Sequence, residues 1–133
     1  MDRPDERSDA RERALYLLYE AQAKGIAPAD TLDLQVVSPD ELTQLLVRGV
    51  GEQLDVIDGH IAAKAHGWTL KRMPVLDLNV MRLAVFELIE RTDVPIAVVL
   101  NEAVELAKRF STDDSGRFVN GVLAAVAADV RPK

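Results

Sequence analysis

The chain has 133 residues, of which 48% are hydrophobic, so it can bury one packed core and is not a globally disordered protein. It has no cysteine, which excludes a disulfide scaffold and thiolate metal sites. It also lacks an apolar run of 18 residues and the apolar core of a signal peptide. We therefore expect a cytoplasmic protein with no membrane segment. Residues 1–70 carry 7 basic and 13 acidic side chains, which account for the net charge of −6; this balance argues against strong unaided nucleic-acid binding and suits a basic partner.

The N-terminal segment predicts one amphipathic helix. Its pattern begins near Ser8 or Asp9, where the spacing of a capping box is present, and ends at a basic residue followed by glycine, Lys24 and Gly25. We therefore expect residues 1–7 to form a flexible tail. The segment that follows, "APADTLDLQVV", predicts one short, weak helix.

A long helix is expected next, from residue 38 to about residue 64. Ser38 is a favourable N-cap, Pro39 suits the first helical position, and Glu41 completes a capping box. Because this helix contains three glycines, we expect it to bend near Gly49–Gly51.

The segment "AHGWTLKRMP" breaks the periodic pattern and predicts a boundary between two helical subdomains, about residues 8–66 and 74–130. After it, apolar side chains at helical spacing predict one helix that ends near Arg91 and another that begins near Asp93 and Pro95. No alternating strand pattern competes with these helices. The sequence therefore predicts an all-α fold class.

The last predicted helix contains an apparent contradiction. An Asn-Gly pair between apolar runs, here Asn120 and Gly121, is a strong hairpin signal, and glycine inside a helix costs about 1 kcal/mol relative to alanine. The residues that follow the pair nevertheless favour a helix. In the preceding loop, "STDDS", Asp114 is the expected cap of this helix.

No catalytic motif is present in the sequence. It has no phosphate-binding loop, no HExxH zinc motif and no Gly-x-Ser-x-Gly nucleophile motif. The two histidines, His60 and His66, are six residues apart, which would place them on different faces of a helix. We expect neither an enzyme nor a bound cofactor or metal.

The second half of the chain contains "DLNVMRLAVFELIERTDVP" followed by "LNEAVELAKRFSTDDSGRFVNGVL". These blocks, in this order, resemble the NusB family of bacterial transcription antitermination factors, and "ARERALYLLYEAQ" fits the family more loosely. The resemblance implies one all-helical domain of two small bundles and about seven helices. It also implies pairing with NusE, a small-subunit ribosomal protein, and binding of boxA RNA in nascent ribosomal transcripts, with RNA polymerase and other antitermination proteins as indirect partners.

The resemblance also implies candidate partner-binding residues. A helical wheel places Leu15 and Tyr19 at the edge of the apolar stripe of the first helix, and Tyr19 matches a family tyrosine near the NusE contact. Asp77 and Arg82 match an acidic residue and an arginine beside the partner and RNA surface; we assign Asp77 to the partner and Arg82 to RNA. A solvated face or an intramolecular ion pair is the competing interpretation for both.

The other candidate RNA-binding residues are basic or aromatic. Lys108, Phe110 and Arg117 flank the "STDDS" loop, where cations suit phosphate and an aromatic ring suits base stacking, although Phe110 also falls on the apolar face of its helix. Members of the family usually carry a basic cluster before the first helix. Here that cluster is diluted, because Arg7 and Arg11 are interleaved with acidic residues.

Because the family has its Val-Asn-Gly-Val-Leu block in the final helix, we expect Asn120 and Gly121 to be helical. Gly121 would permit close approach of another helix, and Asn120 would satisfy backbone groups of a neighbouring loop; direct RNA contact is the alternative. Two other functions stay open. One is a homodimeric helical module that hides the RNA surface, and the other is an RNA-recognition domain like that of ribosomal RNA cytosine methyltransferases, which would need a cofactor-binding α/β domain.

Overall fold

The structure is a computed structural model that describes the backbone of residues 4–132 and the side chains of residues 6–132. Within that range it has seven α-helices, one short 3₁₀-helix and no strand, which confirms the predicted all-α class. No helix in the described range is long and apolar enough to cross a membrane. The elements are α1 (Pro4–Lys24), α2 (Pro28–Asp33), α3 (Glu41–Glu52), α4 (Leu54–Lys64), η1 (Leu70–Arg72), α5 (Val75–Glu90), α6 (Ile96–Phe110) and α7 (Asp113–Val130).

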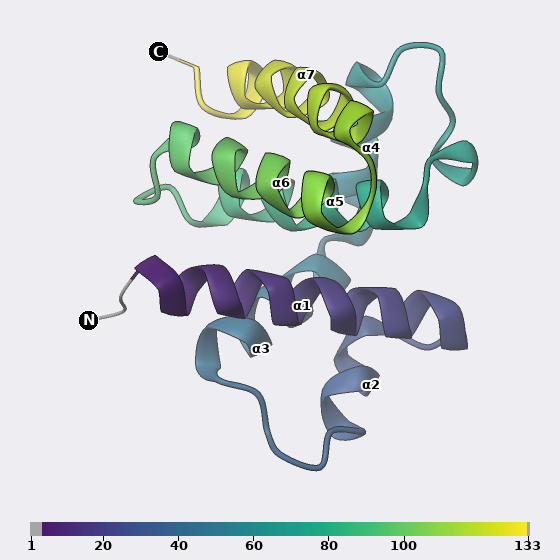
Figure 1. Ribbon diagram of the computed structural model, residues 1–133, viewed down its shortest axis with the longest axis vertical. Coiled ribbons are helices and arrows are strands. Elements are labelled where there is room, and N and C mark those ends of the chain that lie inside the picture. Colours follow the sequence, from purple (N-terminus) through teal and green to yellow (C-terminus); the bar gives the residue numbers. More distant parts are fainter. Residues whose placement is uncertain (1–3, 133) are drawn as a thin grey trace.

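The helices form two layers (Figure 1). In one layer α1 packs against α2 and α3, and in the other α5, α6 and α7 pack on one another while α4 packs against α5 and α7. The chain passes between the layers at Gln53, where the backbone leaves the helical region, so the expected bend near Gly49–Gly51 is a break between two helices. Since Ile57 and Ile61 of α4 are buried in the second layer, the division lies at Gln53 and not at residues 65–74.

The central element is α5. It contacts α1 and α3 in the first layer and α4, α6 and α7 in the second. Eleven of its residues, between Asp77 and Leu88, are buried. A helix enclosed on all sides must be almost uniformly apolar, and for this reason its sequence shows more than the single apolar stripe of a surface helix.

The close helix approach that we assigned to Gly121 occurs at Gly49 instead. A Cβ atom on Gly49 would lie 2.1 Å from the ring of Phe86, so only glycine lets α3 lie this close to α5. Gly121 lies inside α7, as predicted, but it is exposed, and a Cβ atom there would meet nothing within 4 Å. Asn120 is also exposed, and its side chain makes no hydrogen bond within residues 6–132. The structure thus corrects the packing role expected of this pair.

Two helix starts differ from the prediction in the first layer. α1 begins at Pro4, because proline is tolerated in a first turn whose N–H groups have no helical partner. Residues 4–7 therefore belong to the helix and not to a flexible tail, and residues 1–3 lie outside the described part. The N-cap of α3 is Asp40 and not Ser38, since the Asp40 carboxylate accepts a hydrogen bond from the backbone N–H of Thr43 at 3.4 Å.

The cap of α7 also differs. The hydroxyl oxygen of Thr112 accepts a hydrogen bond from the backbone N–H of Ser115 at 3.1 Å, so Thr112 is the N-cap. Asp114, the expected cap, is already the second residue of the helix. Its side chain is exposed and accepts a hydrogen bond from Arg117 at 2.7 Å.

A buried ion pair joins the two layers. Arg11 of α1 and Glu87 of α5 are 5% and 2% exposed, and their side chains share two hydrogen bonds of 2.8 and 3.1 Å. Arg91 donates a third hydrogen bond to Glu87 at 3.4 Å, and Glu102 of α6 lies 3.8 Å from Arg11. Because an unpaired buried charge is strongly unfavourable, these contacts fix the position of α1 against α5 and α6.

We predict opposite effects for alanine at two glycines. Gly49→Ala forces a methyl group into the Phe86 ring and should lower the free energy of unfolding by roughly 1–3 kcal/mol. Gly121→Ala places a methyl group in open space on a helix and should raise the free energy of unfolding by up to about 1 kcal/mol. Urea unfolding followed by circular dichroism measures both, and equal effects would contradict the packing at Gly49.

The buried ion pair gives a second prediction. Arg11→Ala leaves the Glu87 carboxylate inside the protein with only Arg91 beside it, so the free energy of unfolding should fall by about 3 kcal/mol. Arg117→Ala is the matched control, because it removes an ion pair whose side chains are 85% and 87% exposed and should have little effect. If both variants unfold at the same urea concentration, the Arg11–Glu87 pair does not hold the layers together.

Candidate nucleic-acid interface

An aromatic and cationic cluster forms where α1 meets the end of α6. Phe110, half-buried at the last position of α6, contacts Tyr16 of α1 edge to face, with ring centroids 5.5 Å apart. The guanidinium of Arg109 lies 4.9 Å from the centroid of the Phe110 ring and forms an ion pair of 2.7 Å with Glu12. Both Tyr16 and Arg109 are exposed. Tyr16 lies outside the apolar stripe of α1, so the helical pattern alone does not indicate a role for it.

Two further cations lie near the α6–α7 turn, Lys108 on α6 and Arg117 on α7. Lys108 is exposed, and its aliphatic chain crosses Gly116, where a Cβ atom would lie 3.0 Å from the lysine Cγ. It makes no ion pair within residues 6–132, so its ammonium group is available to a phosphate. Arg117 is exposed beside Asp114, in an ion pair that water screens. Lys108 thus lies against α7 at Gly116, the residue before Arg117, whereas Phe110 of the same helix packs on Tyr16 of α1.

Two other arginines expected to bind RNA, Arg11 and Arg82, form ion pairs with carboxylates inside the protein. Arg11 is buried against Glu87, as described above. The side chain of Arg82 is 15% exposed and donates two hydrogen bonds to Asp58 of α4, of 2.8 and 2.9 Å. These placements correct the expectation of RNA contact for Arg11 and Arg82, because carboxylates on neighbouring helices bind both guanidinium groups. Arg7 is half-buried on α1 and makes no ion pair with another described residue.

Tyr19 remains accessible, as the helical wheel indicated. It is 47% exposed on α1. One turn later, the side-chain oxygen of Gln22 accepts hydrogen bonds from Asn79 at 3.1 Å and from Arg82 at 3.4 Å. This part of α1 borders a small surface pocket of about 260 Å³, which also reaches α2, α3, α4 and α5. The pocket is lined by Leu18, Ala21, Gln22, Ile26, Pro28, Val50, Leu54, Asn79 and Arg82.

The structure corrects two other assignments to the partner surface. Leu15 is fully buried, because α1 is covered both by α3 and by α5, and this cover is wider than the apolar stripe suggested. Asp77 is 2% exposed and accepts a hydrogen bond of 2.9 Å from the hydroxyl of Ser115 on α7. Both side chains lie inside the fold, and neither presents a surface to a partner.

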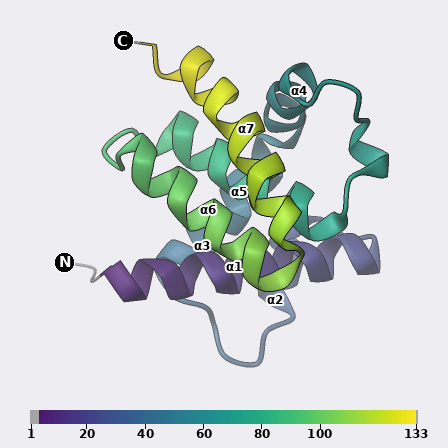
Figure 2. The same cartoon turned by 45° about the horizontal axis from the view of Figure 1, so that its top comes forward.

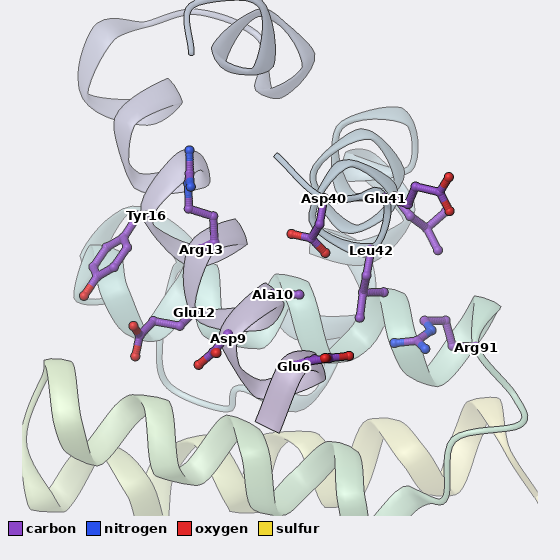
Figure 3. A pocket seen from close by; sticks show the side chains of 11 residues that line it. Glu6, Asp9, Ala10, Glu12, Arg13, Tyr16, Asp40, Glu41, Leu42 and Arg91 are labelled. Carbon is purple, nitrogen blue, oxygen red and sulfur yellow. The ribbon is translucent and has the colours of Figure 1, made fainter. Parts of the chain in front are cut away.

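A wide groove on α1 away from Tyr19, which shares Glu12 and Tyr16 with the aromatic and cationic cluster, is acidic (Figure 3). It has a volume of about 970 Å³ and lies between the first half of α1, the start of α3 and Arg91 at the end of α5. Its lining has five carboxylates and two guanidinium groups, and this excess of negative charge repels phosphate. The lining residues are Glu6, Asp9, Ala10, Glu12, Arg13, Tyr16, Asp40, Glu41, Leu42, Leu45 and Arg91. Among the described residues, no group of three or more His, Asp or Glu side chains is placed to hold a metal ion.

The chain matches the model of the NusB family over residues 8–128. The transcription antitermination protein NusB of Saccharopolyspora erythraea is 49% identical over 127 residues, which cover 91% of this chain and 86% of that protein. The structure of NusB from T. maritima superposes with a TM-score of 0.86 at 32% identity, covering 95% of this chain and 93% of that one. A chain in the crystal structure of the antitermination factors NusB and NusE with double-stranded RNA gives a TM-score of 0.79 at 25% identity, covering 92% and 96%. Since the family model spans most of the sequence and a curated relative is nearly half identical, this chain belongs to the NusB family.

Proposed function

We propose that this protein is a cytoplasmic transcription antitermination factor that pairs with NusE and, with it, binds boxA RNA in nascent ribosomal transcripts. The observation that carries the proposal is the set of groups at the end of α6, where the Phe110 and Tyr16 rings pack together on the α1 side and the unpaired Lys108 lies against Gly116 on the α7 side. Single-stranded RNA is bound by this combination of rings for bases and cations for phosphates. The related NusB that was solved together with NusE and RNA supports the choice of partner and ligand.

The proposed role is that of a non-enzymatic adaptor. Lys108 and Arg117 would bind phosphate groups, and the exposed edges of Tyr16 and Phe110 would contact a base. The protein would hold the RNA near RNA polymerase without making or breaking a bond. The cation–π contact from Arg109 and the edge contact from Tyr16 position the Phe110 ring before RNA binds, which lowers the ordering cost of binding.

The distribution of charge explains why a partner is needed. Arg11 and Arg82 neutralise carboxylates of the same chain, so few cations are left for phosphate. The acidic groove beside α1 adds a repulsive field. A basic ribosomal protein would offset part of this negative field by its own charge and add phosphate contacts of its own.

The candidate surface for NusE is the accessible part of α1 around Tyr19 and Gln22. A tyrosine that is about half exposed offers a large ring for burial and a hydroxyl for a hydrogen bond, which is typical of residues that dominate protein interfaces. The adjacent pocket of about 260 Å³ can accept an apolar side chain of the partner. Its polar rim, made by Asn79, Gln22 and Arg82, is already fixed by hydrogen bonds.

This surface gives a testable prediction for the partner. Tyr19→Asp should weaken the association with NusE by roughly tenfold or more, because a carboxylate replaces an interface ring. Tyr16→Asp is the matched control, since Tyr16 has the same exposed fraction, 47%, on the same helix, and it should bind NusE normally. Calorimetric titration measures the affinity, and circular dichroism checks the fold. If Tyr19→Asp unfolds the protein, or if both variants weaken binding equally, the assignment of this surface to NusE fails.

A second prediction concerns RNA binding. We expect weak binding of a boxA-type RNA by the isolated protein and much tighter binding by its complex with NusE. The affinity of the complex should also fall more steeply with salt, since each additional phosphate contact adds about 0.7 to the log–log slope for a single strand. Titrations at several salt concentrations decide this. Equal affinities and equal slopes would mean that this chain carries a complete RNA site without its partner.

A further inference from the structure

The connector between α4 and α5 carries side chains that the proposed function does not use. Residues 59–76 contain no Asp or Glu, although the whole chain has 22 acidic residues. Within this stretch Lys71 and Arg72 are exposed, and neither makes an ion pair with another described residue. By contrast, Lys64 at the end of α4 forms an ion pair of 2.9 Å with Asp129. The connector is therefore a locally positive surface on a negatively charged protein.

The connector also presents a large aromatic ring. Trp68 is 50% exposed, and the centroid of its ring lies 5.7 Å from that of Phe118 on α7, with the two planes inclined by 55°. Phe118 is half-buried and packs against the core. One side of the indole thus rests on a fixed neighbour, while the rest of its surface is open to a ligand.

The backbone around Trp68 is held in place. Leu70 packs against the core and Met73 is 4% exposed, so they anchor the connector on both sides of its exposed cations. The backbone N–H of Trp68 donates a hydrogen bond to the carbonyl of Ala65 at 3.1 Å, and that of Arg72 donates to Thr69 at 3.0 Å. In Figure 2 this segment projects at the edge of the second layer, between the end of α4 and the start of α5. Anchoring of this kind reduces the entropy lost on binding.

The adjacent face of α7 is open as well. Asn120 and Gly121 lie one turn after Arg117 and Phe118, both are exposed, and nothing in the fold requires glycine at position 121. A glycine there costs helix stability but leaves the backbone accessible, and the free amide of Asn120 can both donate and accept hydrogen bonds. Along α7, Arg117 lies between the α6–α7 turn and this face. Both regions therefore include residues of α7.

We propose that Trp68, Lys71 and Arg72 form a second binding site for single-stranded RNA, in which the indole of Trp68 stacks on a base and the two cations bind adjacent phosphates. This inference rests on the proposed function, because it extends the RNA from the α6–α7 turn along α7 to the connector. Every base has a face that can stack on an aromatic ring, so the second site is tolerant of sequence and binds nucleotides that flank the specific element. A connector with two unpaired cations and no acidic residue of its own, beside an open aromatic ring, fits RNA better than it fits a basic ribosomal protein.

The experiment uses the complex of the full chain with NusE and a boxA-type RNA extended by about six unpaired nucleotides at each end, a length within the range that one stacking groove covers. Trp68 is the only tryptophan of this chain, so its fluorescence reports directly on the second site. Trp68→Phe serves as the matched control, because it keeps an aromatic ring and its complex gives the background signal from the partner. Arg48→Ala, which removes an exposed cation from α3, is the charge control for Lys71→Ala and Arg72→Ala.

We expect the extended RNA to quench the fluorescence of Trp68 and Trp68→Ala to weaken binding by about tenfold, while Trp68→Phe binds nearly as well as the parent chain. Lys71→Ala and Arg72→Ala should each lower the salt slope by about 0.7, whereas Arg48→Ala should not. Normal RNA binding by Trp68→Ala, with no quenching, would overturn the second site and leave the proposed function intact. A loss of NusE affinity in Trp68→Ala would assign the surface to the partner instead. No binding of RNA by the parent complex would overturn the second site together with the proposed function.

Discussion

The carboxylate of Glu87 lies inside the protein, and the helices around it are arranged so that it is never without a cation. Arg11 reaches it from the first layer, and Arg91 reaches it from the following turn of the same helix. Arg131, at the end of α7, donates hydrogen bonds to the backbone carbonyls of Glu87 and Arg91 at 3.0 and 2.8 Å. A charge this deeply buried is strongly unfavourable when unpaired, so it fixes α1 relative to α5, while the backbone contacts of Arg131 hold the end of α7 against α5. The position of α1 then determines both the aromatic contact at the α6–α7 turn and the exposed face around Tyr19.

The same need for pairing divides the surface of the protein into regions of different charge. Arg11 and Arg82 form ion pairs within the fold, so their charges are not available at the surface. The groove along α1 and α3 keeps an excess of carboxylates. Three cations of the second layer, Lys108, Lys71 and Arg72, make no ion pair with another described residue, and each is close in sequence to an exposed or half-exposed aromatic ring. Such an arrangement suits a protein that needs a basic partner on one side and a nucleic acid on the other.

Two helical glycines differ in whether the packing of the fold requires them. Gly49 is required because the ring of Phe86 occupies the space where its side chain would be, so its cost to helix stability is offset by close packing of α3 on α5. Gly121 has the same intrinsic cost but no packing partner. A helix that keeps glycine on an open face loses stability without an internal gain, and this favours a ligand at the exposed face in the middle of α7.

The sequence by itself determined the fold class, the approximate extent of most helices and the membership of the NusB family, because 3.6-residue periodicity and an ordered set of motifs are local properties of the chain. Only the tertiary structure decided which polar side chains are available. Leu15 and Asp77 became buried because two or more helices cover their elements, and the pattern of one helix cannot show how many neighbours it has. From the sequence alone, Arg11 and Arg82 were predicted to be free cations. In the fold they pair with Glu87 and Asp58, which are 76 and 24 residues away in the chain. Ion pairing and burial are long-range consequences of packing, whereas helix formation is a local one.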